Sequence, residues 1–448
     1  MKAFKAYDIR GVYGDQLNED IAYKVGFFLP RVLEADKVLV GRDMRLSSES
    51  LFEALAQGLM DAGVNVFDAG LTTTPMVYWG TAKYNFPASV QITASHNPAD
   101  HNGFKVSGPN AAPVGYDDGL KAIEELITSG EEPVPVENPG FYRALDYRDA
   151  YLDFLKQYKP DISGLKIVID GSNGIGGPFI KDLLKKRPTY IFERPDGTFP
   201  NHDPNPLNPQ NLHALRKKVK AEKADIGIIF DGDADRVMFL DEKGDFISPD
   251  LMIAFMGEYF EDRLTPGTKV IQDIRTSKAV GEYLAPYEVD MYTWRVGRAY
   301  AAKKLREIDG LYGGELAGHY YFKDFYYSDS GLMACLIILN VMKKLKDQGI
   351  SLSERIAEIT PYHSSGEINF KLNQKAEVME AVKNHFMDKE KPEKFMDFDG
   401  YRLNYADWWF NIRPSNTEPY LRLIAEASDK TMLDEKISEI KDIIGRFE

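Results

Sequence analysis

Three stretches of the chain repeat one pattern of apolar and polar positions. Each is a short apolar run that ends in a polar turn, and the three runs cover residues 37–40, 166–169 and 269–271. An apolar strand that leads through a turn into a helix is the building unit of α/β sheets. Because the three units lie about a hundred residues apart along the chain, we expect three related α/β domains.

The helix after the first run has an apolar face and predicted ends. Leucines recur at every fourth position from Leu51 to Leu59, which places them on one side of a helix. Ser47 and Ser48 precede this face and are favoured N-cap residues. Gly63 follows it, at a position where a left-handed residue commonly ends a helix.

The last hundred residues follow a different pattern. Apolar runs typical of strands cover residues 367–372, 401–405, 408–412 and 420–427, and helical patterns cover residues 376–386 and 431–447. Strands that follow one another without helices between them favour an antiparallel sheet. The predicted fold class is therefore α/β, with three related α/β domains and a C-terminal α+β domain arranged around a central cleft.

Segments rich in proline or turn residues divide the chain. They fall near residues 131–140, 245–249 and 360–365, whereas the proline-rich segment 200–209 is predicted to be an extended loop inside the second domain. The chain has 448 residues, and typical domains have about 100–200 residues. We therefore predict domains over residues 1–140, 141–246, 247–362 and 363–448.

Composition narrows the class of protein. Hydrophobic residues make up 44% of the chain and charged residues 28%, which is the balance of a packed globular protein. The net charge of -14 repels nucleic acids and anionic lipids, so we expect neither nucleic acid nor membrane as a partner. The lone cysteine, Cys335, excludes an internal disulfide, and the N-terminus lacks the apolar core of a signal peptide. We expect a cytoplasmic protein, and the sequence leaves its oligomeric state open.

The first chemical motif, TASHNP, covers residues 93–98 directly after a predicted strand. Its proline prevents the strand from continuing, so Ser95 is expected on a turn from which its hydroxyl projects into a cleft. An Asn-Gly pair at 102–103 has the signature of a tight turn that folds Lys105 back towards Ser95. A nearby base or metal ion would activate the serine as a nucleophile. The alternative is a polar turn with an incidental serine.

The second motif, DGDADR, directly follows an apolar strand. Asp231, Asp233 and Asp235 supply the hard oxygen ligands that Mg²⁺ prefers, and acids this close repel one another unless a cation joins them. An EF-hand is excluded because Arg236 occupies the position of its glycine and because a strand precedes the loop. Arg236 suits a phosphate oxygen that shares the site. The alternative is a structural acidic turn.

Two further motifs lie in the predicted third and fourth domains. GGELAGH, at residues 313–319, offers Glu315 as an acceptor for sugar hydroxyls and His319 as an acid or base near neutral pH. RPSNTEP, at residues 413–419, joins an arginine to hydroxyl and amide side chains and is a good cradle for phosphate. Each alone is compatible with an ordinary structural loop. One motif per predicted domain, with Arg10 near the N-terminus, indicates an enzyme for a small phosphorylated polyol with two phosphate subsites.

Together the motifs resemble those of the α-D-phosphohexomutase family, and within it the phosphomannomutase/phosphoglucomutase branch. The resemblance rests on YDIRG at 7–11, TASHNP at 93–98, NGFK at 102–105, DGDADR at 231–236, GELAGH at 314–319 and RPSNTEP at 413–419. It spans the whole chain and implies an enzyme that interconverts hexose 1-phosphate and hexose 6-phosphate, of mannose, glucose or both. Ser95 would carry the phosphoryl group, pass it to the sugar to form a hexose 1,6-bisphosphate, and take back the other phosphate.

The resemblance also implies a set of site residues. Mg²⁺ would be held by Ser95, Asp231, Asp233 and Asp235, and hexose 1,6-bisphosphate would act as activator. The implied catalytic residues are Ser95, Lys105, His319, Arg10, His96 and Arg236, with Lys105 as the general acid/base beside Ser95. The implied substrate-binding residues are Tyr7, Arg275, Gly297, Arg298, Glu315, Ala317, Arg413, Ser415, Asn416 and Thr417.

Two positions depart from the family pattern and bear on substrate choice. Ala317 stands where many relatives have serine, and Arg298 stands where histidine is common. The SNTEP form of the last loop favours mannose or glucose phosphates over glucosamine phosphate, which is the alternative substrate. Two other functions stay open: a Mg-dependent phosphatase of the haloacid dehalogenase type, with Asp231 as nucleophile, and a sugar-phosphate sensor without catalysis.

Overall fold

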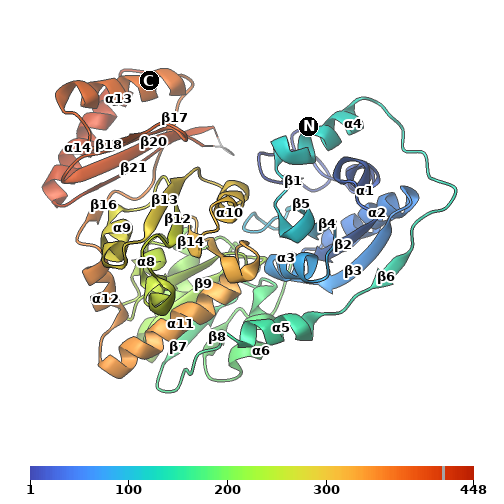
Figure 1. The fold of residues 1–448 in the computed structure, drawn as a ribbon, viewed down its shortest axis with the longest axis horizontal. Coiled ribbons are helices and arrows are strands. Elements are labelled where there is room, and N and C mark those ends of the chain that lie inside the picture. Colours follow the sequence, from blue (N-terminus) through green and yellow to red (C-terminus); the bar gives the residue numbers. More distant parts are fainter. Residues whose placement is uncertain (416–418, 448) are drawn as a thin grey trace.

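The computed structural model describes residues 1–415 and 419–447, and in this part of the chain four sheets follow one another along the sequence. Figure 1 shows the domains built on these sheets in an arc, with the first domain at the right and the C-terminal domain at the upper left. No helix within the described ranges is long and apolar enough to cross a membrane.

The first sheet has the strand order β1-β5-β4-β2-β3-β6. Its strands are β1 (Ile9–Val12), β2 (Lys37–Arg42), β3 (Asn65–Leu71), β4 (Ala88–Ile92), β5 (His101–Ser107) and β6 (Tyr142–Ala144). Its helices are α1 (Glu19–Leu33), α2 (Ser48–Asp61), α3 (Thr74–Lys83) and α4 (Lys121–Thr128). The last strand, β6, pairs with β3 just beyond residue 140, where the sequence analysis set the first boundary; the domain boundaries themselves stay predictions.

The second and third sheets are smaller. The second has the order β11-β10-β9-β7-β8, with β7 (Ile167–Asp170), β8 (Thr189–Ile191), β9 (Ile226–Phe230), β10 (Val237–Leu240) and β11 (Phe246–Ile247). Its helices are α5 (Arg148–Lys156), α6 (Gly176–Leu184) and α7 (His213–Glu222). The third has the order β13-β12-β14-β15, with β12 (Lys269–Asp273), β13 (Asp290–Trp294), β14 (Tyr312–Gly314) and β15 (Tyr320–Phe322). Its helices are α8 (Leu251–Gly257), α9 (Lys278–Leu284), α10 (Arg298–Glu307), α11 (Gly331–Gln348) and α12 (Leu352–Ile359).

The fourth sheet is antiparallel throughout its described pairings, as the sequence predicts. Its strands are β16 (His363–Ser364), β17 (Ile368–Lys371), β18 (Lys394–Met396), β19 (Tyr401–Asn404), β20 (Trp408–Pro414) and β21 (Tyr420–Ala427). Helices α13 (Lys375–Lys389) and α14 (Lys430–Ile444) bury Val378, Val382 and Ile440 in a core of their own.

The first three sheets share one arrangement, which confirms the three predicted α/β units. In each, a central strand (β2, β7 or β12) has parallel neighbours on both sides. One of these neighbours (β4, β9 or β14) then turns back into an antiparallel strand (β5, β10 or β15). The first three of the four predicted chemical motifs occupy these three equivalent connections, so the repeat presents one chemical loop in each α/β domain.

Two local predictions are wrong in detail. The Asn-Gly pair at 102–103 lies inside β5, paired with β1 and β4, and does not form a tight turn. Gly103 serves the sheet instead, because a Cβ there would lie 2.2 Å from the carbonyl oxygen of Ile9. Ser47 is the N-cap of α2, as predicted, but among the described residues its hydroxyl makes no capping hydrogen bond and instead accepts one from Asn102 Nδ2 at 2.9 Å.

Candidate active site

Ser95 lies at the meeting point of the first and second domains. It follows β4 in the connection to β5, is fully buried, and has the left-handed φ of 52°. Its Oγ donates a 2.8 Å hydrogen bond to Asp231 Oδ2, and its backbone N donates to Thr93 Oγ1 at 2.9 Å. Gly232 allows this approach, since a Cβ at that position would lie 2.4 Å from the carbonyl oxygen of Ser95. The two predicted motifs are thus in direct contact.

The three aspartates of the second motif form a buried cluster whose carboxylate oxygens lie within 4.8 Å of one another. Two of these oxygens, Asp233 Oδ1 and Asp235 Oδ1, are buried and have no hydrogen-bond partner in the described part of the chain. Burial, followed by the neighbouring carboxylates of Asp235 and Asp233, raises the pKa of Asp231 well above its usual range. Unpaired hard oxygens in a buried acidic cluster are what a divalent cation such as Mg²⁺ requires, so these residues fit the predicted metal.

Lys105 orients two of the three acids. Its Nζ donates to Asp233 Oδ2 at 2.6 Å and to Asp235 Oδ2 at 2.5 Å, which leaves the Oδ1 atoms for another ligand. Burial opposes the charge of Lys105, but Asp233 and Asp235 outweigh it and raise the lysine pKa. Lys105 lies opposite Gln91 in the pairing of β5 with β4, and this strand pairing, not a tight turn, brings its side chain to the acids.

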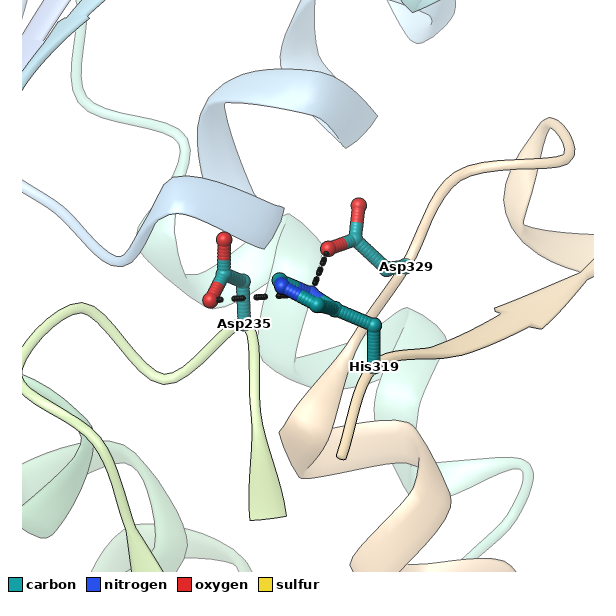
Figure 2. Close-up of side chains that lie close together, drawn as sticks. All are labelled: Asp235, His319 and Asp329. Carbon is teal, nitrogen blue, oxygen red and sulfur yellow. Dashed lines mark hydrogen bonds and ion pairs between the residues drawn. The ribbon is translucent and has the colours of Figure 1, made fainter. Parts of the chain in front are cut away.

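His319 is held by an aspartate that the sequence analysis missed. Its Nδ1 lies 2.6 Å from Asp329 Oδ2 and 3.9 Å from Asp235 Oδ1, and Figure 2 shows the imidazole between these two carboxylates. Its Nε2 accepts a hydrogen bond from Arg236 Nε at 3.0 Å, so Nδ1 is the atom that donates to Asp329. The group therefore holds the imidazole in one orientation between the second and third motifs.

Arg298 contacts the same aspartate, Asp329, that holds His319. Its Nε donates to Asp329 Oδ1 at 3.0 Å, and its guanidinium lies over the ring of Tyr78, 4.1 Å from the centroid. The pKa of Asp329 is about 2, because the neighbouring Arg298 and His319 outweigh the opposing effect of burial. The predicted substrate-binding residue Arg298 is thus engaged with Asp329 and Tyr78.

The basic side chains predicted to bind the phosphate lie around Ser95. His96 Nδ1 lies 3.3 Å from Ser95 Oγ, and Arg10 donates to Asn97 Oδ1 at 2.9 Å and also pairs with Asp8. Burial, then the charges of Arg236 and Arg10, lower the pKa of His96 well below its usual range. An acidic chain therefore presents a locally cationic surface to the serine.

The predicted sugar-reading residues form a second group. Glu315 Oε1 accepts hydrogen bonds from the backbone N of Gly297 at 3.2 Å and from Tyr321 OH at 3.1 Å. Gly297 has φ 129°, and a Cβ there would lie 2.6 Å from the ring of Tyr7, whose hydroxyl donates to the carbonyl of Val296 at 3.0 Å. Ala317 is half-buried in the same β14–β15 connection. Glu315, Gly297 and Tyr7 thus lie close together, and the role of this group in sugar binding stays a prediction.

The predicted phosphate cradle lies in the C-terminal domain. Arg413 Nε donates to Asp399 Oδ1 at 3.0 Å, while its buried Nη2 has no hydrogen-bond partner among residues 1–415 and 419–447. Asp399 Oδ2 accepts from the backbone N of Val296 at 2.7 Å, which ties the cradle to the Gly297 segment. Ser415 N donates to the carbonyl of Tyr420 at 2.8 Å, and the predicted ligands Asn416 and Thr417 lie outside the described residues.

Arg275 faces the cradle from the third domain. It makes hydrogen bonds of 3.1 and 2.8 Å to the two oxygens of Asp273 and lies 3.5 Å from Glu367 Oε2. Glu367 also pairs with Arg422 of β21 at 3.1 Å. Cations from two domains therefore converge on one carboxylate beside the cradle.

Several residues of the site have no motif in the sequence. Thr74 Oγ1 donates to Asp233 Oδ2, and Thr74 N donates to the Asp233 carbonyl at 3.1 Å. Asp329 and Asp399 are single acids outside the motifs, and their partners His319 and Val296 are 10 and 103 residues away in the chain. One signal could have been used: Asp43-x-Arg45, just after β2, repeats as Asp273-x-Arg275 at the end of β12, and in both the arginine N donates to the aspartate Oδ1.

Comparison with known proteins identifies the family. Sequence models for phosphoglucomutase/phosphomannomutase alpha/beta/alpha domains I, II and III match residues 1–134, 149–244 and 248–362, and the model for the C-terminal domain matches residues 367–443. A phosphomannomutase of Salmonella montevideo is 38% identical over 460 residues, covering 99% of each chain, and that of Escherichia coli K12 is 38% identical over 441 residues, covering 95% of each. The crystal structure of a phosphoglucomutase/phosphomannomutase family protein from Burkholderia thailandensis has a TM-score of 0.87 at 30% identity, covering 99% of this chain and 96% of that one. The predicted fold class and family resemblance are confirmed, and the chain is a mutase that belongs to the phosphoglucomutase/phosphomannomutase family.

Proposed function

We propose that the enzyme interconverts the 1-phosphate and 6-phosphate of a hexose, mannose or glucose, through a phosphorylated Ser95. The observation that carries the proposal is the 2.8 Å hydrogen bond from Ser95 Oγ to Asp231, at the edge of a buried acid cluster with unpaired oxygens. A phosphoryl group on Oγ would have Asp231 and the cluster on one side and the side chains of Arg10, His96 and Arg236 around it. Mg²⁺ held by Ser95, Asp231, Asp233 and Asp235 would supply electrostatic stabilisation of the transferring phosphoryl oxygens.

The reaction consists of two transfers in opposite directions. In the first, the bond from phosphorus to Ser95 Oγ breaks as a bond to the free sugar hydroxyl forms, giving a hexose 1,6-bisphosphate. The hydroxyl proton leaves to a base, and Ser95 Oγ regains a proton; Lys105 and His319 are the proposed proton carriers. After the intermediate turns over, its other phosphate returns to Ser95. Added hexose 1,6-bisphosphate would activate unphosphorylated enzyme by the same chemistry.

The binding residues suit a substrate that binds in two orientations. Within the described ranges, the buried Nη2 of Arg413 has no hydrogen-bond partner and suits the phosphate that does not react, and Arg275 lies in the third domain. Ser415, Asn416 and Thr417 belong to the same proposed cradle. Glu315 is a buried acceptor, held by Gly297 and Tyr321, for sugar hydroxyls common to both orientations.

The location of the enzyme in the cytoplasm stays a prediction.

The phosphatase alternative requires Asp231 as a free nucleophile. Both of its oxygens accept hydrogen bonds, Oδ2 from Ser95 Oγ and Oδ1 from the backbone N of Arg236 at 3.2 Å. A carboxylate engaged on both oxygens is a poor attacking group, whereas the serine hydroxyl beside it is oriented. The geometry therefore favours the serine as the carrier.

The test combines Ser95→Ala with a matched serine elsewhere. Ser107 is buried in β5 of the same domain and its Oγ makes no hydrogen bond within the described ranges, so Ser107→Ala should leave activity unchanged. With Mg²⁺ and hexose 1,6-bisphosphate, kcat/KM is measured for mannose 1-phosphate, glucose 1-phosphate and glucosamine 1-phosphate. We expect isomerisation of one or both of the first two, its abolition by Ser95→Ala, and a phosphoserine at residue 95 by mass spectrometry.

Three results would redirect the assignment. Turnover of glucosamine 1-phosphate in preference to the others would make the enzyme a phosphoglucosamine mutase. Release of inorganic phosphate that survives Ser95→Ala would support a phosphatase acting through Asp231. Binding of sugar phosphate without turnover in the wild type would support a sensor.

A further inference from the structure

The loop that carries Ser95 is gripped from beneath by one buried arginine. Arg45 follows β2, outside the motifs that carry the family resemblance, and its side chain has no exposed surface. Its Nη2 donates to the carbonyl oxygens of Ser95 at 3.0 Å and Asn97 at 2.6 Å, and its Nη1 donates to those of Pro98 at 2.6 Å and His101 at 3.0 Å. One guanidinium therefore joins four carbonyls across seven residues of the loop.

The guanidinium is itself fixed from other directions. Arg45 Nε lies 3.3 Å from Asp43 Oδ2, and Asp43 Oδ1 accepts from Arg45 N at 3.0 Å and from Ser48 Oγ at 2.7 Å. The ring of Phe199, from the second domain, lies over the guanidinium with its centroid 4.9 Å from Cζ. Arg45 thus holds the loop against a preformed anchor that spans two domains.

This grip acts on a strained backbone. Ser95 has φ 52°, a left-handed conformation that a non-glycine residue adopts only where its surroundings impose it. Its carbonyl oxygen is held by Arg45 on one side and faces Gly232 at close approach on the other. Rotation of this peptide towards a relaxed φ would break the Arg45 contact and swing Oγ away from Asp231.

We propose that Arg45 is a positioning residue for phosphoryl transfer, which keeps the strained Ser95 turn aimed at the acid cluster; this rests on the proposed role of Ser95. The role needs the planar fork of a guanidinium, because a lysine ammonium is a single point donor that cannot span four carbonyls. Arg45 holds the Ser95 loop through backbone carbonyls and lies in the first domain, away from the proposed C-terminal cradle. Its loss should therefore slow phosphorylation of Ser95 while leaving hexose phosphate binding in that cradle intact.

The experiment compares Arg45→Lys and Arg45→Met with Arg42→Lys in the full-length chain. Arg42 lies on β2, where its guanidinium pairs with Glu49 and Asp68 and lies over the ring of Phe52, so it controls for loss of a nearby arginine. Each protein is mixed with Mg²⁺ and glucose 1,6-bisphosphate, and phosphoserine formation at residue 95 is timed by mass spectrometry. Deuterium exchange of the 94–101 backbone and KM for hexose 1-phosphate are measured in parallel.

We expect phosphorylation about 100-fold slower in both Arg45 variants, as for a reacting group displaced by about 1 Å. Exchange in the 94–101 segment should accelerate, and KM should stay within about threefold. Arg42→Lys should match the wild type in all three. If the Arg45 variants do not fold, Asp43→Asn, which keeps Arg45 but weakens its anchor, should still slow phosphorylation about tenfold.

Two results would overturn the proposal. One is phosphorylation of Arg45→Lys, or of Asp43→Asn if that variant carries the test, at a rate within about threefold of the wild type. The other is a fall in rate matched by an equal rise in KM, which would indicate general distortion instead of positioning. A wild-type enzyme that forms no phosphoserine would instead refute the proposed function, and the role of Arg45 would fall with it.

Discussion

Replacing Glu426 with glutamine should stabilise the contact between the C-terminal and third domains above neutral pH. Glu426 lies on β21, is buried, and accepts a 2.8 Å hydrogen bond from Trp409 Nε1. Burial, followed by the Asp250 carboxylate of the third domain, raises its pKa from 4.5 to about 7. Arg402 lies nearby, and its Nη1 donates to the carbonyls of Ile274 and Thr276 in the third domain. Its charge lowers the pKa of Glu426 and offsets only part of the rise caused by burial.

The size of the effect follows from proton linkage. With a raised pKa in the folded state, the folded protein binds more protons than the unfolded chain between pH 4.5 and about 7, so stability falls as the pH rises through this window. A pKa raised from 4.5 to about 7 lowers the free energy of unfolding by about 3 kcal/mol at pH 8, where both states are ionised, and by less than about 1 kcal/mol at pH 5. A glutamine at this position can still accept the hydrogen bond from Trp409 Nε1 and carries no charge. Glu426→Gln therefore removes the free-energy cost of ionising the buried carboxyl group.

The assay is urea unfolding at pH 5 and pH 8, followed by tryptophan fluorescence. Trp408 and Trp409 both lie on β20 and report on the C-terminal domain. Glu426→Gln should gain about 3 kcal/mol over the wild type at pH 8 and little at pH 5. Glu53→Gln, at an exposed glutamate of α2, is the control and should change neither value. An equal gain at both pH values would refute the reasoning, because only a titrating carboxylate makes the gain depend on pH.

Three further predictions concern the active site. Gly232→Ala places a Cβ 2.4 Å from the Ser95 carbonyl oxygen, so phosphoserine formation should slow at least about tenfold; an unchanged rate by mass spectrometry would show that the two loops separate freely. Asp233→Asn removes a carboxylate whose Oδ1 is buried and unpaired within the described chain, so Mg²⁺ affinity by calorimetry should fall, and equal affinity would exclude Asp233 as a ligand. Asp399→Asn loosens Arg413, held at 3.0 Å, and should raise KM for hexose 1-phosphate more than it lowers kcat; the opposite pattern would assign Asp399 to the chemistry.

Local features of the structure could be predicted from the sequence because they depend on residues that are neighbours in the chain. The apolar strand 88–92 and the polar turn after it predict where Ser95 lies, and β4 covers Ala88–Ile92 as expected. The alternating aspartates of 231–235 indicate a cation site from charge repulsion alone. The Asn-Gly pair at 102–103 does not form the predicted turn, because pairing of β5 with strands on both sides outweighs a local turn preference.

The sequence by itself determined the order of the α/β units, the antiparallel C-terminal domain and the chemical character of each loop. Only the tertiary structure decided that Lys105 orients Asp233, that Asp329 holds His319, and that Arg45 grips the Ser95 loop. The reason is physical: a strand, a turn or an acid cluster is specified by neighbours in the chain. A lone buried arginine or aspartate acquires its partner only when segments that are not neighbours in the chain pack together and exclude water from the charge.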